Sequence, residues 1–294
     1  MSNTDDFAPR CLWPAEATLG EGVLWDAAAR RVWFVDIKGR RIHRCAFDGS
    51  DQRSWDAPGQ VSFIVPAADG GMVCALDDGL YRFSDTSGEF ALLAKVEAEL
   101  PGNRFNDGHV GADGALWFGS MDDAENGPTG ALYRFDGAQV ARMDEGYVIT
   151  NGPAVSPDGR TLYHTDTLEK RIYAFDLALD GGLSNKRRFV ELQDGGYPDG
   201  MAVDAAGQLW VATFGGWRID RFDASGSKVG EVRFPCANVT KLAFGGEDLR
   251  TVYATTARKG LSPSELATQP LAGGLFSFRV ETPGLPQHLL RIEE

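Results

Sequence analysis

The stretch SPDGRTLYHTDTLEKRIYAFDL, residues 156–177, decides the fold because its pattern recurs along the chain. It opens on a polar turn that contains a glycine and continues into a strand rich in aromatic and β-branched residues. A short loop then leads into a second strand of similar composition. The turn residues and the short apolar runs are typical of β structure, and no helical period is present. The stretch therefore predicts two neighbouring antiparallel strands.

Similar units occupy most of the chain. The acidic residue of the turn recurs at intervals of 43 to 46 residues, at Asp26, Asp69, Asp113, Asp158, Asp204 and Glu247. A period in the mid-forties with four strands per unit is the signature of a propeller blade. We therefore expect an all-β protein, a six-bladed β-propeller that forms a single domain over residues 1–294. The segments CLWPAEATL and QHLLRIEE are expected to pair within the last blade and close the ring.

The composition argues against several kinds of partner. The chain has 29 Lys and Arg against 42 Asp and Glu, a formal net charge of −13, so neither nucleic acid nor an anionic membrane surface is expected to bind. The sequence contains no apolar run long enough to span a membrane, and the start MSNTDDFAPR lacks the apolar core of a secretion signal. The cysteines share no CxxC spacing, so we expect free thiols and a cytoplasmic protein. They are Cys11, Cys45, Cys74 and Cys236. We also expect the protein to be a monomer or a weak oligomer.

A set of polar residues is predicted at one mouth of the central channel. The first strand of each blade lines the channel, and the six segments at its start read LGEG, GQVS, FNDG, ITNGP, YPDG and NVTK. Glu21, Asn151 and Asp199 come from three blades and would point to a shared centre. Two carboxylates held close together repel each other unless a cation lies between them. The basic residues Arg104 and Lys241 are slightly displaced from the equivalent positions at the mouth, so neither is expected to serve as that cation. A divalent metal therefore fits, although each residue alone is also a common turn former.

Four segments resemble the senescence marker protein/gluconolactonase/luciferin-regenerating-enzyme-like family. They are ATLGEGVLWD, RFNDGHVGADGALWFGSM, ITNGPAVSPDGRTLYHTDT and YPDGMAVDAAGQLWVA, in the family's order and over nearly the whole chain. Within the family, the sequence looks closest to bacterial sugar-acid lactonases of pentose catabolism. The resemblance implies a six-bladed propeller with one divalent metal in the channel. It also implies hydrolysis of a sugar aldono-lactone to the free acid, with a pentono-lactone such as xylono- or arabinono-lactone favoured.

The resemblance also implies roles for single residues. The family's metal ligands match Glu21, Asn151 and Asp199, and its substrate-contacting Arg and Asn match Arg104 and Asn106. A surface Arg and a turn Asn are the alternative interpretations of that last pair. A further acidic substrate contact follows GSM, and three residues compete for it. We take Asp122 as the candidate, with Asp123 and Glu125 as the alternatives.

The implied chemistry needs a polarised carbonyl, an activated water and recognised hydroxyl groups. The oxygen ligands suit Ca²⁺, Mg²⁺ or Mn²⁺, and the lack of a His or Cys ligand argues against structural zinc. Zn²⁺ and Fe²⁺ are the other ions that the site could bind. The metal would act as a Lewis acid and lower the pKa of water. Asp199 is the expected general base, because a ligand carboxylate lies within reach of that water. Asp107 is the alternative base, and the competing role for it is to hold the NDG turn.

Two other functions stay open. The alternatives are another esterase on the same scaffold, such as an arylesterase or phosphotriesterase, and a non-catalytic propeller that binds partners.

Long loops at residues 121–130 and 257–274 are expected on the channel-mouth face, where they would shape substrate preference. Within the second, SPSELATQ predicts a short helix capped by Ser262 or Ser264. His164 is expected to be packed or to face solvent, with substrate contact as the alternative.

Overall fold

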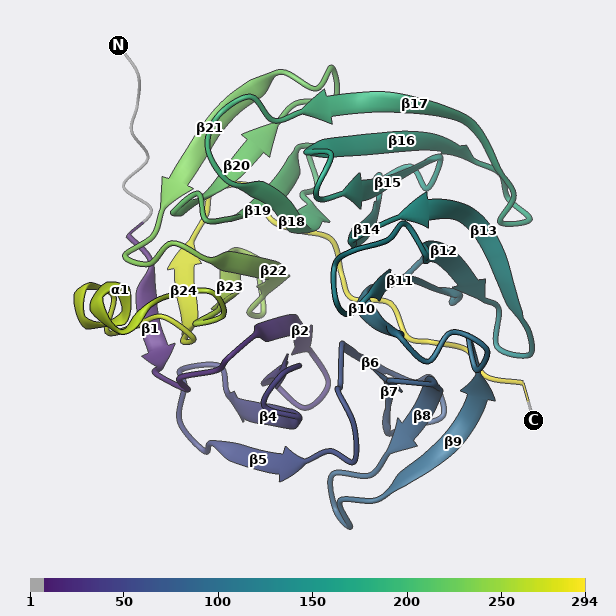
Figure 1. Ribbon diagram of the computed structural model, residues 1–294, viewed down its shortest axis with the longest axis horizontal. Helices are drawn as coiled ribbons and strands as arrows, with labels where there is room; N and C mark the ends of the chain where they lie inside the picture. The colour runs from purple at the N-terminus through teal and green to yellow at the C-terminus, as the bar shows by residue number, and fades with distance from the viewer. Residues whose placement is uncertain (1–7, 294) are drawn as a thin grey trace.

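The computed structural model describes residues 8–293, which form six four-stranded antiparallel sheets around a central axis (Figure 1). Residues 1–7, part of the segment in which no targeting signal is expected, lie outside this range. The six-bladed β-propeller predicted from the repeat is confirmed. The first blade contains β2 (Gly20–Asp26), β3 (Arg31–Asp36), β4 (Arg41–Ala46) and β5 (Arg53–Asp56).

The next four blades follow the same plan, each made of consecutive strands with the first strand nearest the axis. The second contains β6 (Ile64–Pro66), β7 (Met72–Leu76), β8 (Gly79–Phe83) and β9 (Phe90–Lys95). The third contains β10 (Asn103–Val110), β11 (Leu116–Asp122), β12 (Gly130–Phe135) and β13 (Val140–Tyr147). The fourth contains β14 (Thr150–Val155), β15 (Thr161–Asp166), β16 (Arg171–Leu177) and β17 (Leu183–Glu191). The fifth contains β18 (Tyr197–Val203), β19 (Leu209–Phe214), β20 (Arg218–Phe222) and β21 (Lys228–Arg233).

The sixth blade closes the ring with strands from both parts of the chain. It contains β22 (Val239–Gly245), β23 (Thr251–Thr256) and β24 (Leu275–Arg279), and its outer strand is β1 (Arg10–Trp13). The strand β1 pairs antiparallel with β24, so that Cys11 lies opposite Phe276. The start of the chain therefore closes the ring, as the sequence predicts.

The end of the chain does not join this blade, so that part of the prediction is wrong. Residues 281–293, named here the C-terminal strap, run across the ring towards the third blade (Figure 1). Leu290 forms a bridge with Ala67 of the second blade, and the Arg291 N–H donates to the Gly114 carbonyl of the third blade. The strap contains Pro283 and Pro286, and proline lacks the N–H that a sheet ladder requires.

The apolar core lies between neighbouring blades and fixes the inner strands. Val73 and Leu80 of the second blade pack in one cluster with Phe118 and Phe135 of the third. The inner strand β2 is buried along nearly its whole length. Each blade is therefore held by close packing on both faces, which gives a fixed frame for the side chains at the channel mouth.

The inner strands of five blades share an irregularity near their start. At that point the register with the second strand shifts, as in a β-bulge, and a bulge re-aims the side chains that it carries. The shifts occur between Glu21 and Leu24, Phe105 and Gly108, Asn151 and Ala154, Pro198 and Met201, and Val239 and Lys241. The polar residues expected at the channel mouth lie at these bulges.

The long loop before β24 contains the predicted short helix, α1 (Pro263–Thr268). Ser262 is its N-cap and accepts a hydrogen bond from the Glu265 N–H, and Glu265 completes the capping box. Ser262 is therefore the cap of the two serines considered. Within residues 8–293, no helix has the length and the apolar composition needed to cross a membrane.

Candidate functional site

A cavity of about 350 Å³ opens at the channel mouth. Five residues predicted for the site line it, namely Glu21, Arg104, Asn106, Asn151 and Asp199. Part of its wall is apolar and includes Leu168, Tyr197 and Phe214. A concave site with an apolar wall and a few convergent polar groups is the usual form of a small-molecule site. The fold therefore brings the sequence-predicted residues together in one place.

Asn151 links neighbouring blades through its amide. Its Oδ1 accepts a hydrogen bond of 2.9 Å from Asn106 Nδ2, and its Nδ2 donates one of 2.9 Å to Thr167 Oγ1. The Thr167 hydroxyl in turn donates to the Pro198 carbonyl, next to Asp199. The side chain is thus engaged across blades rather than in capping its own turn, and its orientation is fixed.

Glu21 and Asp199 place two buried carboxylates in the floor of the cavity. They are 3% and 5% exposed. Burial raises the pKa of Glu21 well above its usual value, and repulsion from Asp199 and Asp107 adds to the rise. Burial likewise raises the pKa of Asp199, and the charge of Asp107 contributes. Concentrated negative charge of this kind favours a cation in the same place.

Asp107 is neutralised by a neighbouring lysine. Its Oδ2 lies 2.5 Å from Lys241 Nζ, in a pair that is almost wholly buried. The same carboxylate accepts hydrogen bonds from the backbone N–H groups of Gly108 and Gly152. Burial raises the pKa of Asp107, while Lys241 and these N–H groups counteract the rise. Lys241 is therefore committed to Asp107, which leaves Glu21 and Asp199 without an ion-pair partner of their own among the described residues.

Arg104 is held rigidly in the cavity wall. Its Nε donates to Asp123 Oδ1 at 2.7 Å, and its Nη1 donates to Asn106 Oδ1 at 2.6 Å. The side chain is 2% exposed. Asn106 also donates to the Thr150 carbonyl and to Asn151. These two residues are therefore a connected, pre-oriented pair, rather than a surface Arg and a turn Asn.

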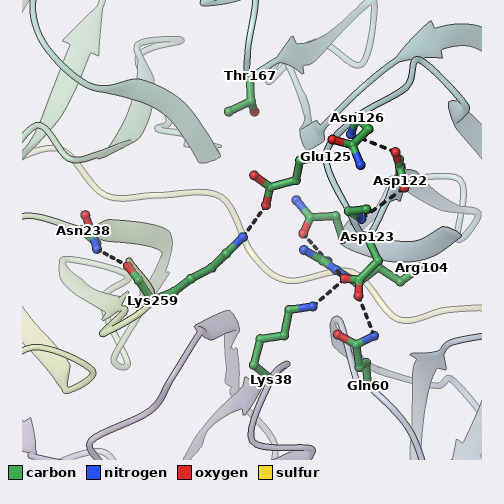
Figure 2. A network of polar contacts seen from close by, with 12 residues as sticks. Lys38, Gln60, Arg104, Asp122, Asp123, Glu125, Asn126, Thr167, Asn238 and Lys259 are labelled. Atoms are coloured by element: carbon green, nitrogen blue, oxygen red, sulfur yellow. Dashed lines mark hydrogen bonds and ion pairs between the residues drawn. The ribbon is translucent and has the colours of Figure 1, made fainter. Parts of the chain in front are cut away.

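The loop after β11 separates the three acids that competed for one role. Asp122 accepts hydrogen bonds from the backbone N–H groups of Ala124, Asn126 and Gly127, and so holds its own loop. Asp123 instead contacts Arg104, and it also pairs with Lys38 of the first blade at 2.5 Å (Figure 2). The Asp122 carboxylate is thus engaged by the loop backbone, and its role as a substrate contact stays a prediction.

The third acid of that loop, Glu125, lines the cavity and pairs with Lys259 (Figure 2). Lys259 belongs to the loop between β23 and α1, so the pair joins the third and sixth blades. The sequence indicates that both loops lie over the site, and the structure confirms this. The individual contact across 134 residues is not visible in the sequence. Lys259 was missed for that reason, and so was Lys38, whose partner Asp123 is 85 residues away. Thr167 was missed although it lies only 16 residues from its partner Asn151.

The residues at the cavity floor fit a hard divalent cation. Glu21 and Asp199 supply buried carboxylate oxygens, and Asn151 supplies a fixed amide oxygen. Within residues 8–293, no group of three or more His, Cys, Asp or Glu side chains is arranged to hold a metal. Glu21, Asn151 and Asp199 do not form a group of that kind, because Asn151 contributes an amide. Oxygen ligands of this kind suit Ca²⁺, Mg²⁺ and Mn²⁺.

His164 is packed, as expected, and does not reach the cavity. It is fully buried, and its ring meets Tyr147 edge to face with centroids 4.9 Å apart. Among the described residues, neither ring nitrogen has a hydrogen-bond partner. Burial lowers the pKa of His164 to about 3. The imidazole therefore acts as an apolar filler between strands.

Comparisons with known proteins agree on one family. Residues 19–258 match the model described as SMP-30/Gluconolactonase/LRE-like region. The chain is 34% identical to a 6-deoxy-6-sulfogluconolactonase of Pseudomonas putida, over 95% of this chain and 97% of that protein. It is 36% identical to an L-arabinolactonase of Azospirillum brasilense, over 91% and 90%. A solved structure of a calcium-binding protein, regucalcin, from Agrobacterium tumefaciens superposes with a TM-score of 0.93 and 30% identity, over 97% of this chain and 98% of that one.

Proposed function

Because this chain belongs to the SMP-30/gluconolactonase/LRE-like family, we propose that it hydrolyses sugar aldono-lactones to the free sugar acids. The observation that carries the proposal is the cavity at the channel mouth, in which Glu21, Asn151 and Asp199 meet Arg104 and Asn106. Two relatives that match nearly the whole chain are lactonases of sugar acids. A pentono-lactone such as arabinono- or xylono-lactone is the favoured substrate, in line with the L-arabinolactonase.

The proposal includes one divalent cation held by Glu21, Asn151 and Asp199. When bound, it supplies Lewis-acid polarisation of the ester carbonyl and lowers the pKa of a nearby water. The support is the pair of buried carboxylates, whose pKa values are raised first by burial and then by repulsion from neighbouring carboxylates, and which form no ion pair among the described residues. Ca²⁺ is the first ion to test, because a similar solved protein is described as calcium-binding. Mg²⁺, Mn²⁺, Zn²⁺ and Fe²⁺ are the alternatives.

Asp199 is the proposed general base. It lines the cavity, where a ligand carboxylate lies within reach of the attacking water. The Asp199 carboxylate accepts a proton as a water oxygen attacks the carbonyl carbon. The ring C–O bond then breaks, and the same proton passes to the departing ring oxygen. Asp107 is less suited to this role, since its carboxylate is paired with Lys241 and bound by two N–H groups.

Arg104 and Asn106 are the proposed substrate-orienting residues. Their mutual hydrogen bond and the Asp123 contact hold the guanidinium in place, so that little entropy is lost when substrate binds. The Nε and Nη1 groups of Arg104 donate to protein atoms, so its Nη2 is the group left to donate to substrate oxygens. Both N–H groups of the Asn106 amide donate to the Thr150 carbonyl and to Asn151, so its Oδ1 is the atom left to accept from a substrate hydroxyl. This combination recognises a carbonyl and hydroxyl groups, and the apolar wall formed by Leu168, Tyr197 and Phe214 covers the ring.

We place the reaction in the cytoplasm and expect a monomer or weak oligomer. The four cysteines are free and three of them are buried, which suits a reducing compartment. The substrate is a small molecule, and the net charge of −13 gives no attraction for nucleic acid or an anionic membrane.

The deciding experiment is a panel of pentono- and hexono-lactones, together with aryl esters and phosphotriesters. Each is assayed with metal-stripped protein and after return of one metal at a time, and spontaneous lactone opening is subtracted. The proposal predicts fast, metal-dependent opening of sugar lactones. Preferential turnover of the aryl esters or phosphotriesters would establish the other esterase function instead. No turnover above the spontaneous rate with any metal would leave the non-catalytic propeller.

A further inference from the structure

The hydrogen bonds around Asn151 all run in one direction of donation. Arg104 Nη1 donates to Asn106 Oδ1, and Asn106 Nδ2 donates to Asn151 Oδ1. Asn151 Nδ2 then donates to Thr167 Oγ1, and the Thr167 hydroxyl donates to the Pro198 carbonyl at 3.0 Å. Each side chain between the two ends therefore accepts from one neighbour and donates to the next, from the third blade to the fifth.

The chemistry of the two ends fixes this direction. A guanidinium N–H donates and never accepts, and a carbonyl oxygen accepts and never donates. A hydroxyl group carries a single hydrogen, so Thr167, which gives it to Pro198, offers Asn151 only an acceptor. The NH₂ group of Asn151 must therefore face Thr167. From the other end, Arg104 holds the oxygen of Asn106, so Asn106 turns an N–H towards Asn151.

This direction decides which atom of Asn151 a cation would meet. The amide oxygen has two lone pairs, and the hydrogen bond from Asn106 uses one of them. The other has no hydrogen-bond partner among the described residues, and the side chain lines the cavity together with Glu21 and Asp199. If the amide were turned over, its NH₂ group, which is only a donor, would replace the oxygen, and the site would lose a ligand.

Thr167 is well placed to hold the amide in this orientation. It is 6% exposed, borders the cavity and directly follows β15 (Figure 2). Its backbone N–H donates to the Ile149 carbonyl at 3.1 Å, and its carbonyl accepts from the Lys170 N–H at 3.0 Å, so the place of the residue does not depend on its hydroxyl. A β-branched side chain is stiff at χ1, which keeps the hydroxyl between Asn151 and Pro198.

We propose that Thr167 is a positioning residue whose hydroxyl orients the Asn151 amide and so presents the amide oxygen to the cation. The inference rests on the cation site of the proposed function. Removal of a group that orients a metal ligand typically lowers metal affinity or activity roughly 10- to 100-fold. A carboxylate in place of the amide would not need such a group, because both of its terminal atoms are oxygens.

The test is a double-mutant cycle on metal affinity, measured by calorimetric titration of Ca²⁺ or Mn²⁺ into metal-stripped protein. Thr167→Val removes the hydroxyl with little change of shape and is expected to weaken binding about 10-fold or more. Thr167→Ser keeps the hydroxyl and should bind within about 3-fold of wild type, less than the effect of a lost hydrogen bond. In Asn151→Asp, where orientation no longer matters, adding Thr167→Val should weaken binding by less than about 3-fold.

Thr256→Val is the matched control. Thr256 is fully buried, its hydroxyl donates to the Gly274 carbonyl at 2.9 Å, and it does not line the cavity. The change should lower stability as Thr167→Val does, but leave metal affinity unchanged. Wild-type affinity in Thr167→Val, or the same loss with and without Asn151→Asp, would overturn this inference alone. A wild-type protein that binds no cation would overturn the proposed cation site and this inference with it.

Discussion

Asn151 is the residue from which the channel mouth is organised. A continuous chain of hydrogen bonds runs from Arg104 through Asn106 and Asn151 to Thr167, and then to the carbonyl of Pro198. It crosses the third, fourth and fifth blades. A networked polar group of this kind has one orientation, so the amide of Asn151 is held in place in the cavity that Glu21 and Asp199 also line.

Asp107 and Lys241 form a buried ion pair whose two halves depend on each other. In Asp107→Asn, the Lys241 ammonium, 6% exposed, loses the carboxylate that it contacts, and the free energy of unfolding is expected to fall by about 3–5 kcal/mol. The double change Asp107→Asn with Lys241→Met should recover much of that loss. Urea unfolding measures both. As a control, Asp248→Asn breaks an exposed pair and should have little effect. A similarly small effect of Asp107→Asn would contradict the account.

His164 makes the stability dependent on pH. Its folded pKa of about 3 lies below the unfolded value of about 6.5, so only the unfolded chain binds a proton between these values. Stability is therefore lost as pH falls below about 6.5. Relative to pH 8, wild type at pH 5 is expected to lose about 2 kcal/mol more than His164→Phe. Urea unfolding at the two pH values tests this, and identical losses would be inconsistent with a buried neutral imidazole.

The sequence predicted single residues well where the repeat fixes their position. Glu21, Asn151 and Asp199 hold equivalent places in three blades, and the structure gathers them as expected. The choice of Asp122 as substrate contact stays a prediction, because the conformation of its loop, and not the period, decides which acid faces Arg104. The contact between Glu125 and Lys259 joins two loops outside the repeat, so no local pattern encodes it.

At the scale of elements, the bulge at the start of the inner strands aims the polar side chains into the channel. Two bulges carry a glycine with positive φ, Gly22 at +57° and Gly152 at +75°. At Gly22, an added Cβ would lie 3.0 Å from Phe63 Cα in the neighbouring blade. The position therefore requires glycine both for its conformation and for the close approach. Periodicity predicts the strand but not the bulge, because the extra residue leaves the turn spacing within its normal variation.

Gly22→Ala should disturb both stability and the site. We expect the free energy of unfolding to fall by about 1–3 kcal/mol, and lactone hydrolysis to fall with it, since Glu21 is the adjacent residue. Gly70→Ala is the matched control. It also has a positive φ, +90°, but an added Cβ would meet no atom within 4 Å. Chemical unfolding and kinetics on both variants separate the effects. Equal losses in the two would show that the contact with Phe63 is unimportant.

At the scale of the whole molecule, two segments hold the ring of blades together. The strand β1 completes the sixth blade, as the sequence predicts, because its residues continue the blade pattern. The C-terminal strap instead bonds to the fifth blade through Pro283, to the second through Leu290, and to the third through Arg291 and Glu293. A short segment with two prolines and few apolar residues has no period, and its place could not be predicted. We infer that the strap helps the ring to unfold as one unit.

Leu290 is the apolar anchor of the strap. It is fully buried in the cluster between the second and third blades, whereas its neighbour Leu289 is 50% exposed. Leu290→Ala is expected to lower the free energy of unfolding by about 2–5 kcal/mol, and Leu289→Ala by less than about 0.5 kcal/mol. Urea unfolding followed by tryptophan fluorescence compares them. A small effect of Leu290→Ala, equal to that of its neighbour, would mean that the strap does not stabilise the ring.

The central claim is that Glu21, Asn151 and Asp199 hold the cation that lactone hydrolysis requires. Calorimetric titration of Ca²⁺ and Mn²⁺ into metal-stripped protein tests it most directly. We predict one site in the wild type and in Glu247→Gln, which alters an exposed glutamate. Glu21→Gln and Asp199→Asn should each weaken binding by at least about 100-fold, because a charged ligand is lost, while the fold is retained. Wild-type affinity in both variants, or no binding in the wild type, would contradict the account.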